Sequence, residues 1–251
     1  MDTLKETPVI SAPSVASPAH EELKRSTLTE SDHVPDIEAD RAYEFERAVT
    51  GVATNGTNDD RELRLAELRN YIGECRRCPL HLQRTRLVFG EGNPAARLML
   101  VGEGPGSEED RTGRPFIGKA GQLLDRIIAA MGLDRKDVFI GNVVKCRPPG
   151  NRDPEPDEIA VCRAFLDAQI DIIRPQILLA LGKISGRVLT GIPDATLASL
   201  RGVFYQYRQI DLRVTYHPAA LLRNPAYRRP VWEDIQTIMA RLGLPVPPVK
   251  S

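Results

Sequence analysis

The chain has 251 residues, and its 34 Lys or Arg residues balance 34 Asp or Glu residues, so the formal net charge is zero. This length suits one domain of moderate size with appendages. No run of about 18 apolar residues occurs, which excludes a membrane-spanning helix, and the N-terminus lacks the basic and apolar regions of a secretory signal. We therefore expect a cytoplasmic protein whose cysteines are reduced or metal-bound rather than paired in disulfides.

The zero net charge hides an asymmetry along the chain. Residues 1–60 hold 5 Lys or Arg against 13 Asp or Glu, a net of −8, whereas residues 61–251 hold 29 against 21, a net of +8. A basic folded part with an acidic arm favours a polyanionic partner, and nucleic acid is the partner that we expect.

Residues 1–60 are expected to be a disordered acidic arm, because prolines interrupt any helix and Ser, Thr, Glu and Asp dominate. A short helix near 36–50 is compatible with this composition. The arm is either an interaction tail or a dispensable leader. One folded domain is predicted over 61–243, and a proline-rich tail over 244–251.

Strands and helices alternate along the predicted domain. An amphipathic helix that contains Leu65, Leu68 and Ile72 leads into the first cysteine. Strands are predicted over 96–103, 137–145 and 176–181, and as a hairpin over 202–206 and 209–214. Helices are predicted over 118–131, 155–174, 183–190 and 230–242. Because the strand runs are continuously apolar, we expect an α/β fold with a central, mostly parallel sheet that helices cover on both faces.

Each of the sharper motifs follows directly after a predicted strand. A glycine turn with four carboxylates spans 102–110, a second motif spans 142–151, and a third spans 217–224. The carboxyl ends of parallel strands lie along one edge of a sheet, so these segments are expected to converge there and form a ligand site. The glycine turn is not a P-loop, because no Gly-Lys-Ser or Gly-Lys-Thr follows it.

The chain has four cysteines, and two of them, Cys75 and Cys78, have CxxC spacing. The others are Cys146, directly after a strand, and Cys162. Four thiolates with none left over suit a single tetrahedral site, which would tie the N-terminal helix to the sheet. The cysteine pattern leaves structural zinc and a [4Fe–4S] cluster both open, with unrelated core cysteines as the alternative. A thioredoxin-like pair is disfavoured because two further cysteines are at hand.

With these motifs in place, the chain resembles family 4 uracil-DNA glycosylases, the iron–sulfur type found in bacteria and archaea. The matching pieces are the cysteine frame, GEGPGSEEDRTGRPFIGKAGQLLD, NVVKCRPPGNRDPEP and HPAALLRNP, which together cover about residues 65–242. The resemblance implies a three-layer α/β/α fold, hydrolysis of the N-glycosidic bond of deoxyuridine in DNA, and a [4Fe–4S] cluster, with zinc as the less favoured occupant. All four cysteines match the cluster ligands one for one.

Base recognition is assigned by the resemblance together with the chemistry of four residues. Asn142 has an amide that can donate to uracil O4 and accept from N3–H, whereas cytosine presents the opposite pattern. Phe116 is expected to stack on the flipped base. His217 resembles the family histidine that donates to uracil O2 as negative charge develops there. Leu221 matches the residue that wedges into the gap left in the duplex, and we expect it to be exposed; burial of these residues for purely structural reasons is the alternative.

Water activation is the step that the sequence assigns least sharply. Better-known uracil glycosylases carry an aspartate in the glycine turn, and this chain has Gly104 in the equivalent place. Glu103, Glu109 and Asn151 are the remaining candidates. Asn151 can position water but is a poor base, and Glu109 can instead shape the pocket near uracil C5.

Phosphate contacts are expected from the backbone amides of 104–107 and from arginines on the neighbouring loops. These arginines are Arg147, Arg152, Arg223, Arg228 and Arg229. We predict a monomeric, monofunctional uracil-DNA glycosylase that starts base excision repair in a prokaryotic cytoplasm, associated with the nucleoid while it acts on DNA. The alternatives are a non-catalytic iron–sulfur DNA-binding module, and a divergent glycosylase that acts on another deaminated base or traps the abasic sugar covalently.

Overall fold

The computed structural model describes residues 57–247, so most of the predicted arm, with its short helix, lies outside the described residues. Six strands form one sheet in the order β1-β3-β2-β4-β6-β5. The four central strands run parallel, and the two edge strands pair antiparallel. The strands are β1 (Glu91–Gly92), β2 (Leu98–Gly102), β3 (Phe139–Asn142), β4 (Ile177–Leu181), β5 (Phe204–Tyr207) and β6 (Ile210–Thr215). The predicted α/β fold with a mostly parallel sheet is confirmed.

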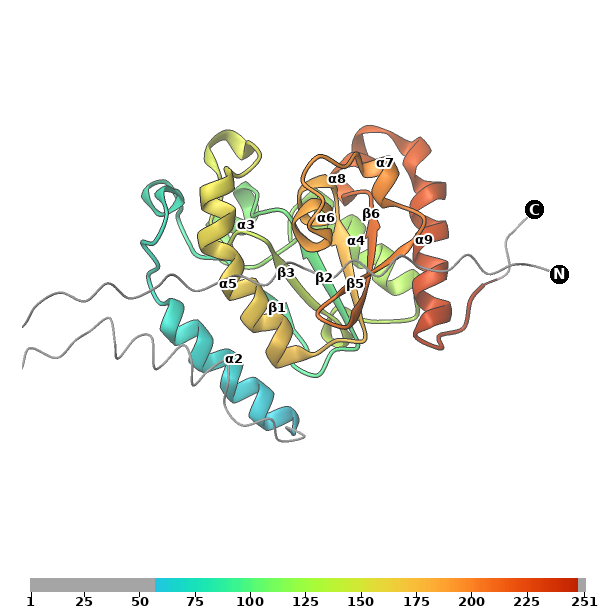
Figure 1. Ribbon diagram of the computed structural model, residues 1–251, viewed down its shortest axis with the longest axis horizontal. Helices are drawn as coiled ribbons and strands as arrows, with labels where there is room; N and C mark the ends of the chain where they lie inside the picture. Colours follow the sequence, from blue (N-terminus) through green and yellow to red (C-terminus); the bar gives the residue numbers. More distant parts are fainter. Residues whose placement is uncertain (1–56, 248–251) are drawn as a thin grey trace, which may run out of the picture.

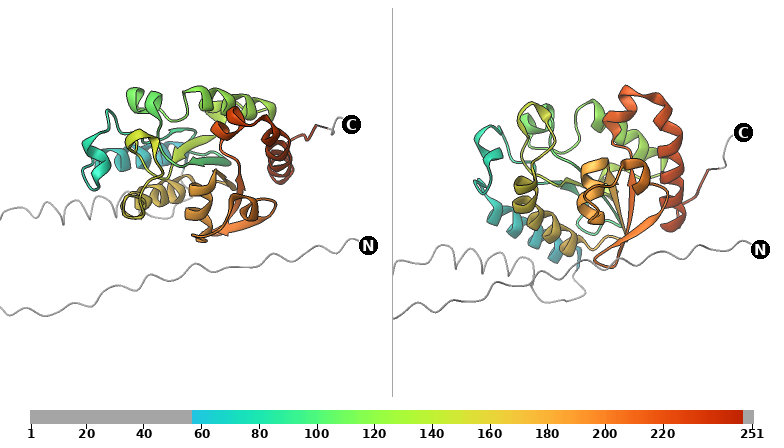
Figure 2. Two further views of the ribbon diagram at one scale, coloured as in Figure 1. Left: turned by 90° about the horizontal axis from the view of Figure 1, so that it is seen from above. Right: turned by 45° about the horizontal axis from the view of Figure 1, so that its top comes forward.

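Helices cover both faces of this sheet (Figures 1 and 2). On one face lie α4 (Lys119–Ala130) and α9 (Arg228–Arg241); on the other lie α2 (Asn58–Ile72), α5 (Pro156–Ile173) and α6 (Lys183–Thr190). Shorter helices connect them: α3 (Ser107–Thr112), α7 (Leu197–Leu200), α8 (Pro218–Arg223), and 3-10 turns over Pro79–Leu82, Arg135–Asp137, Pro149–Asn151 and Pro225–Tyr227. None of the described helices is long and apolar enough to cross a membrane.

The central strand β2 shows why the apolar runs are continuous. All of its residues are buried. Leu98 and Leu100 belong to the core between the sheet and α4 and α9, whereas Met99 and Val101 belong to the core on the opposite face. Successive side chains of a strand point to opposite faces, so a strand covered on both faces needs an apolar residue at every position.

Within residues 57–247, the sequence pattern did not predict the 3-10 turns, the strand β1, or the short helices α3, α7 and α8. Each has six residues or fewer, which is too short for a helical or strand period to show. The closing helix α9 also begins earlier than the predicted 230–242, because Pro230 falls in its first turn, where backbone N–H groups have no intrahelical partner. The predicted hairpin is present, and Arg208 and Gln209 form its turn with φ of 50° and 66°, as tight hairpin turns require.

Candidate active site and cysteine site

A cavity of about 510 Å³ lies at the carboxyl ends of the central strands and is called the strand-end cavity here. Residues from the three predicted segments, 102–110, 142–151 and 217–224, line it together with residues that follow β4. It is bordered by seven of the eight predicted catalytic and substrate-binding residues: Glu103, Gly104, Glu109, Phe116, Asn142, Asn151 and His217. The structure therefore brings the predicted site together, with Leu221 as the exception.

Asn142 is the last residue of β3 and lines the strand-end cavity. It is buried, with 1% of its surface exposed. Its Oδ1 atom has no hydrogen-bond partner among the described residues. Gly102 pairs beside it on β2, and a Cβ on that glycine would lie 2.4 Å from Asn142 Oδ1. An unpaired buried acceptor is unfavourable by about 1–3 kcal/mol, so this oxygen is suited to a ligand that supplies an N–H group.

The ring of Phe116 lies beside this amide. Phe116 is 5% exposed, and its ring centroid is 5.4 Å from that of His217, with the two planes inclined by 35°. A Cβ on Gly102 would come within 2.5 Å of Phe116 Cζ, so the strand end and the ring are in close contact. The ring thus borders the cavity where a planar base can stack on it.

His217 caps α8, and its Nδ1 atom accepts a hydrogen bond from the backbone N–H of Ala219 at 3.1 Å. Burial lowers the pKa of His217 to about 4, helped by the positive charge of Arg223 and opposed by Glu109. The imidazole is therefore neutral near pH 7, and because Nδ1 accepts, its proton is on Nε2. Nε2–H is the donor that this histidine can offer to a ligand.

Glu103 directly follows β2 and lines the same cavity. Burial raises the pKa of Glu103 to about 7; the negative charge of Asp153 acts in the same direction, and Lys183 opposes both. A carboxyl group that titrates near the working pH is a stronger base than an ordinary carboxylate, and a substantial fraction of it is still ionised to take a proton from water. Among the candidates for water activation, Glu103 therefore has the required chemistry.

Glu109 has a different role in the structure. Its Oε1 atom accepts hydrogen bonds from the backbone N–H groups of Ile117 and Gly118, each at 2.9 Å. Its Oε2 atom accepts from Gly106 N–H at 3.1 Å. Both oxygens are thus used to order the loop around the cavity, and one amide of the turn that was expected to hold a phosphate is already engaged.

The basic loops around the cavity are partly paired. Asn151 is exposed and has φ of 56°, and its Oδ1 atom accepts from Arg147 Nε at 2.7 Å. Arg152 makes two hydrogen bonds to Glu158, at 2.9 and 2.7 Å, so its charge is neutralised locally. The remaining predicted phosphate-binding arginines are exposed on or beside α8 and at the start of α9: Arg223, Arg228 and Arg229.

Leu221 corrects one expectation. It is 3% exposed and packs in the core shared by α4 and α9, whereas the prediction required an exposed side chain. Its neighbour Leu222 is 50% exposed. The segment forms helix α8, in which consecutive side chains point about 100° apart. The burial of one leucine therefore exposes the next.

The four cysteines line one small cavity, the cysteine cavity, between the N-terminal segment, the end of β3 and α5. None of the four forms a disulfide. Three of their sulfur atoms accept hydrogen bonds: Cys146 from Arg84 at 3.3 Å, Cys75 from Arg77 at 3.5 Å, and Cys162 from the backbone N–H of Lys145 at 3.3 Å. Burial raises the pKa of the Cys162 thiol to about 12. No group of three or more metal-ligating side chains within residues 57–247 is arranged to hold a single metal ion.

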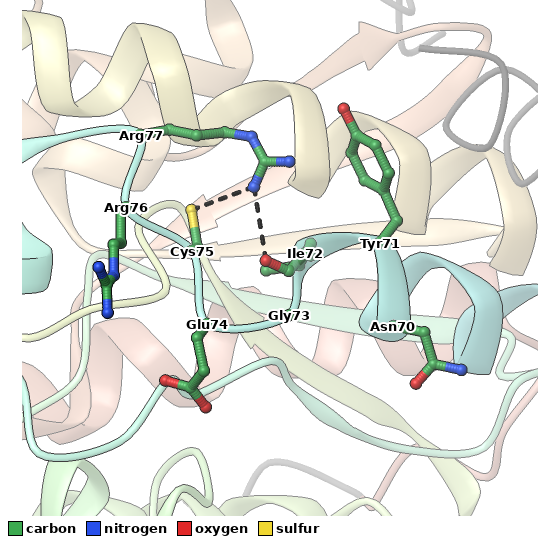
Figure 3. A pocket seen from close by; sticks show the side chains of 8 residues that line it. All are labelled: Asn70, Tyr71, Ile72, Gly73, Glu74, Cys75, Arg76 and Arg77. Atoms are coloured by element: carbon green, nitrogen blue, oxygen red, sulfur yellow. Dashed lines mark hydrogen bonds between the residues drawn. The ribbon is translucent and has the colours of Figure 1, made fainter. Parts of the chain in front are cut away.

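A further cavity of about 640 Å³ lies beside the cysteine cavity and is lined by residues 70–77 (Figure 3). Arg77 lies over the ring of Tyr71, with its guanidinium carbon 4.8 Å from the ring centroid, and donates to Cys75 and to the backbone of Ile72. Although larger, this cavity lies away from the strand ends. The amide of Asn142, the imidazole of His217 and the carboxyl group of Glu103 all line the strand-end cavity instead.

Three positions in or around these sites were missed by the sequence reasoning. Lys183 lines the strand-end cavity 3.4 Å from Asp153 Oδ2, and its place directly after a strand was a signal that could have identified it. Arg84 and Arg135 act through long-range contacts with the cysteine site and with the Phe116 loop. Nothing local in the sequence indicates either contact.

Comparison with known proteins agrees with this geometry. Residues 89–236 match the family model described as the uracil DNA glycosylase superfamily. The chain is 46% identical over 182 residues to a type-4 uracil-DNA glycosylase of Sulfurisphaera tokodaii, which covers 69% of this chain and 83% of the relative. It is 46% identical over 178 residues to that of Pyrobaculum aerophilum, covering 68% and 91%. It is 47% identical over 173 residues to that of Thermotoga maritima, covering 66% and 88%. The chain therefore belongs to the type-4 uracil-DNA glycosylases of this superfamily.

Proposed function

We propose that the protein flips deoxyuridine out of DNA and hydrolyses its N-glycosidic bond, releasing uracil and leaving an abasic site for base excision repair. The observation that carries this proposal is the unpartnered, buried Oδ1 of Asn142, with the ring of Phe116 beside it and the neutral His217 close to that ring. A duplex hides the glycosidic bond, so the base must leave the stack to reach this cavity.

Asn142 supports discrimination of uracil from cytosine. Its Oδ1 accepts from uracil N3–H, and its amide N–H donates to O4. Cytosine places an acceptor at N3 and a donor at N4, so it would leave the buried amide unpaired. Each unpaired group is unfavourable by about 1–3 kcal/mol. Uracil is therefore favoured over cytosine without a change in the protonation state of any protein side chain.

His217 supports departure of the base. When the C1′–N1 bond breaks, the bonding electrons go to uracil, and negative charge develops at O2. The Nε2–H of a neutral imidazole donates a hydrogen bond to that oxygen. The hydrogen bond from Ala219 N–H to Nδ1 fixes the tautomer in which Nε2 carries the proton, so the donor is in place before the bond breaks.

Glu103 supports the attack of water. The ionised carboxylate accepts a proton as the water oxygen bonds to C1′, and its negative charge also stabilises the positive charge that develops on the sugar. Glu109 is occupied by three backbone N–H groups and is assigned to ordering the pocket. Asn151, at the exposed rim of the strand-end cavity, is assigned to orienting the attacking water or the DNA backbone. It is not assigned as the general base.

The exposed side chains of α8 support contact with DNA. Leu222, and not the buried Leu221, is assigned to filling the gap that the flipped base leaves, because it is the exposed leucine of the pair. Arg223 and the exposed arginines at the start of α9 are assigned to phosphates. Contacts of this kind make binding fall steeply with salt.

The four cysteines are assigned as the ligands of a [4Fe–4S] cluster, with zinc as the less favoured occupant, and what supports this is that all four line one cavity. Cationic or backbone donors reach three of the sulfurs, and these hydrogen bonds offset part of the unfavourable effect that burial has on thiolate ligands. When bound, the cluster would supply a structural cross-link between the segment after α2, the end of β3, and α5. A monomer acting in the cytoplasm stays a prediction from the sequence.

The test is incubation of the purified protein with DNA that contains a single uracil, followed by alkali, with a thymine duplex as control. Strand cleavage at uracil alone supports the proposal. Uncleaved uracil DNA that the protein nevertheless binds would indicate a binding module, and a DNA adduct that survives denaturing electrophoresis would indicate covalent trapping. Iron and zinc contents of the same sample decide the occupant of the cysteine cavity.

A further inference from the structure

The loop that carries Phe116 is held in an unfavourable backbone conformation. Phe116 has φ of 49°, a region that a residue with a Cβ atom seldom adopts. Such a conformation persists only when the surrounding structure over-determines it. The ring that faces His217 at 5.4 Å is therefore placed by contacts made to the loop backbone, which come from Arg135, Glu109 and Gly121.

Arg135 holds the carbonyl groups of this loop. Its Nη1 atom donates to Phe116 O at 3.0 Å, and its Nη2 atom donates to Pro115 O. The remaining contacts anchor the guanidinium: Nε donates to Glu91 Oε1 at 2.6 Å, and Nη1 donates to Asp125 Oδ1 at 2.9 Å. The side chain is 21% exposed. The guanidinium group is therefore largely enclosed between the edge strand β1, the helix α4 and the loop that carries Phe116.

Two other residues hold this loop, Glu109 from its amide side and Gly121 from the same carbonyl side as Arg135. Glu109 accepts from the N–H groups of Ile117 and Gly118. In the first turn of α4, Gly121 packs so closely that a Cβ would lie 1.9 Å from Phe116 O. The carbonyl and amide sides of the loop are thus fixed independently, by an arginine and by a carboxylate.

We propose that Arg135 is a positioning residue for uracil recognition, which acts by holding the carbonyls of Pro115 and Phe116 so that the phenylalanine ring is a preformed platform for the flipped base. This inference rests on the proposed function and names a residue outside the cavity on which that function depends. The role needs a planar fork with several N–H donors, which arginine has and lysine lacks. Arg135 touches neither the base nor the sugar in this assignment.

The experiment compares Arg135→Gln with Arg114→Gln. Arg114 is the matched control because it also pairs with Glu91, at 2.9 Å, but is 62% exposed and makes no recorded contact with the two carbonyls. The probe is free uracil, used as a competitive inhibitor of uracil release, because it reports on the base site without the DNA backbone.

Arg135→Gln is expected to weaken inhibition by free uracil and to lower kcat/KM by about 10- to 100-fold, as small misplacements of a binding surface do. Arg114→Gln is expected to behave as the wild type. Thermal unfolding of both variants is followed by circular dichroism, and assays are run well below either transition. If Arg135→Gln is inhibited by uracil as strongly as Arg114→Gln, the inference is overturned.

A double-mutant cycle separates positioning from general destabilisation. If Arg135 acts through the ring, adding Arg135→Gln to Phe116→Leu causes little further loss of uracil inhibition; an additive loss overturns the inference. Should Arg135→Gln fail to fold, Glu91→Gln removes the anchor of the guanidinium and is expected to weaken inhibition less but in the same direction. A wild type that releases no uracil overturns the proposed function as well, whereas an active wild type with unaffected variants overturns the inference alone.

Discussion

The strand-end cavity and the cysteine cavity differ in how their polar groups are satisfied. In the former, Asn142 Oδ1 has no partner among the described residues, and burial raises the pKa of the Glu103 carboxyl. In the latter, Arg84, Arg77 and the backbone of Lys145 donate to three of the four sulfurs. Buried polar groups normally have partners. The difference therefore indicates that the first cavity is built for a ligand that arrives and leaves, and the second for a resident group.

The largest expected effect comes from Glu103. Its pKa is raised to about 7, so the ionised base is lost as the pH falls, and kcat/KM is expected to drop about tenfold per pH unit below about 7. His217, with a pKa of about 4, stays neutral through this range. Glu103→Gln is expected to lower kcat by about 10²–10⁴ and to abolish the pH dependence. A wild-type profile that is flat from about pH 5.5 to 8.5 would reject Glu103 as the base.

His217→Ala is expected to lower single-turnover kcat by about 10²–10³, as the loss of one donor to a developing anion does. Binding of uracil DNA should change little, because the hydrogen bond strengthens only as the base departs. Single-turnover rates and equilibrium DNA binding are measured on the same preparation. An equal loss in both quantities would contradict the assignment to the transition state.

Arg84→Met tests the cysteine cavity, in which three of the sulfur atoms already have hydrogen-bond donors. The side chain is 6% exposed and donates to Cys146 Sγ and to Cys75 O. For protein that carries the proposed cluster, loss of such a partner is expected to speed iron release to a chelator by about 10- to 100-fold, while protein that retains its iron releases uracil normally. Arg76→Met, at an exposed neighbour on the same segment, is the control. Iron retention equal to that of the control would reject this role for Arg84.

The smallest expected effect on the reaction comes from Leu222. Leu222→Ala is expected to weaken base flipping by roughly tenfold, measured by the fluorescence of 2-aminopurine placed next to uracil. Its free energy of unfolding should change by less than about 0.5 kcal/mol. Leu221→Ala should instead lower that free energy by about 2–5 kcal/mol. The reverse pattern would restore Leu221 as the wedge.

The sequence predicted the parts of the fold that a local pattern encodes. Apolar runs predicted β2 and β4, and helical periodicity predicted α4 and α5, because both patterns need only neighbouring residues. The rule that ligands bind at the carboxyl ends of parallel strands then predicted that Asn142 lies where the strand-end cavity is found. Short elements such as α8 hold too few residues for a period to show.

The features that the sequence did not predict depend on contacts between distant residues. Glu109 was a candidate for water activation or for shaping the pocket near uracil C5, and nothing in the sequence showed that three backbone amides donate to its carboxylate. Arg135 lies 19 residues after Phe116, whose carbonyl group it holds, and helix α4 lies between them in the sequence. The burial of Leu221 follows from the packing of α8 against the core. None of these contacts leaves a local trace in composition or periodicity.

The most direct test of the account is the substrate preference of Asn142→Asp. Rates of release are measured on matched DNA strands with one uracil or one unpaired cytosine, alongside the wild type. Uracil release is expected to fall by about tenfold or more, since a carboxylate cannot donate to O4, and the ratio of cytosine to uracil release is expected to rise. An unchanged ratio in a folded variant would contradict the claim that this amide reads the base.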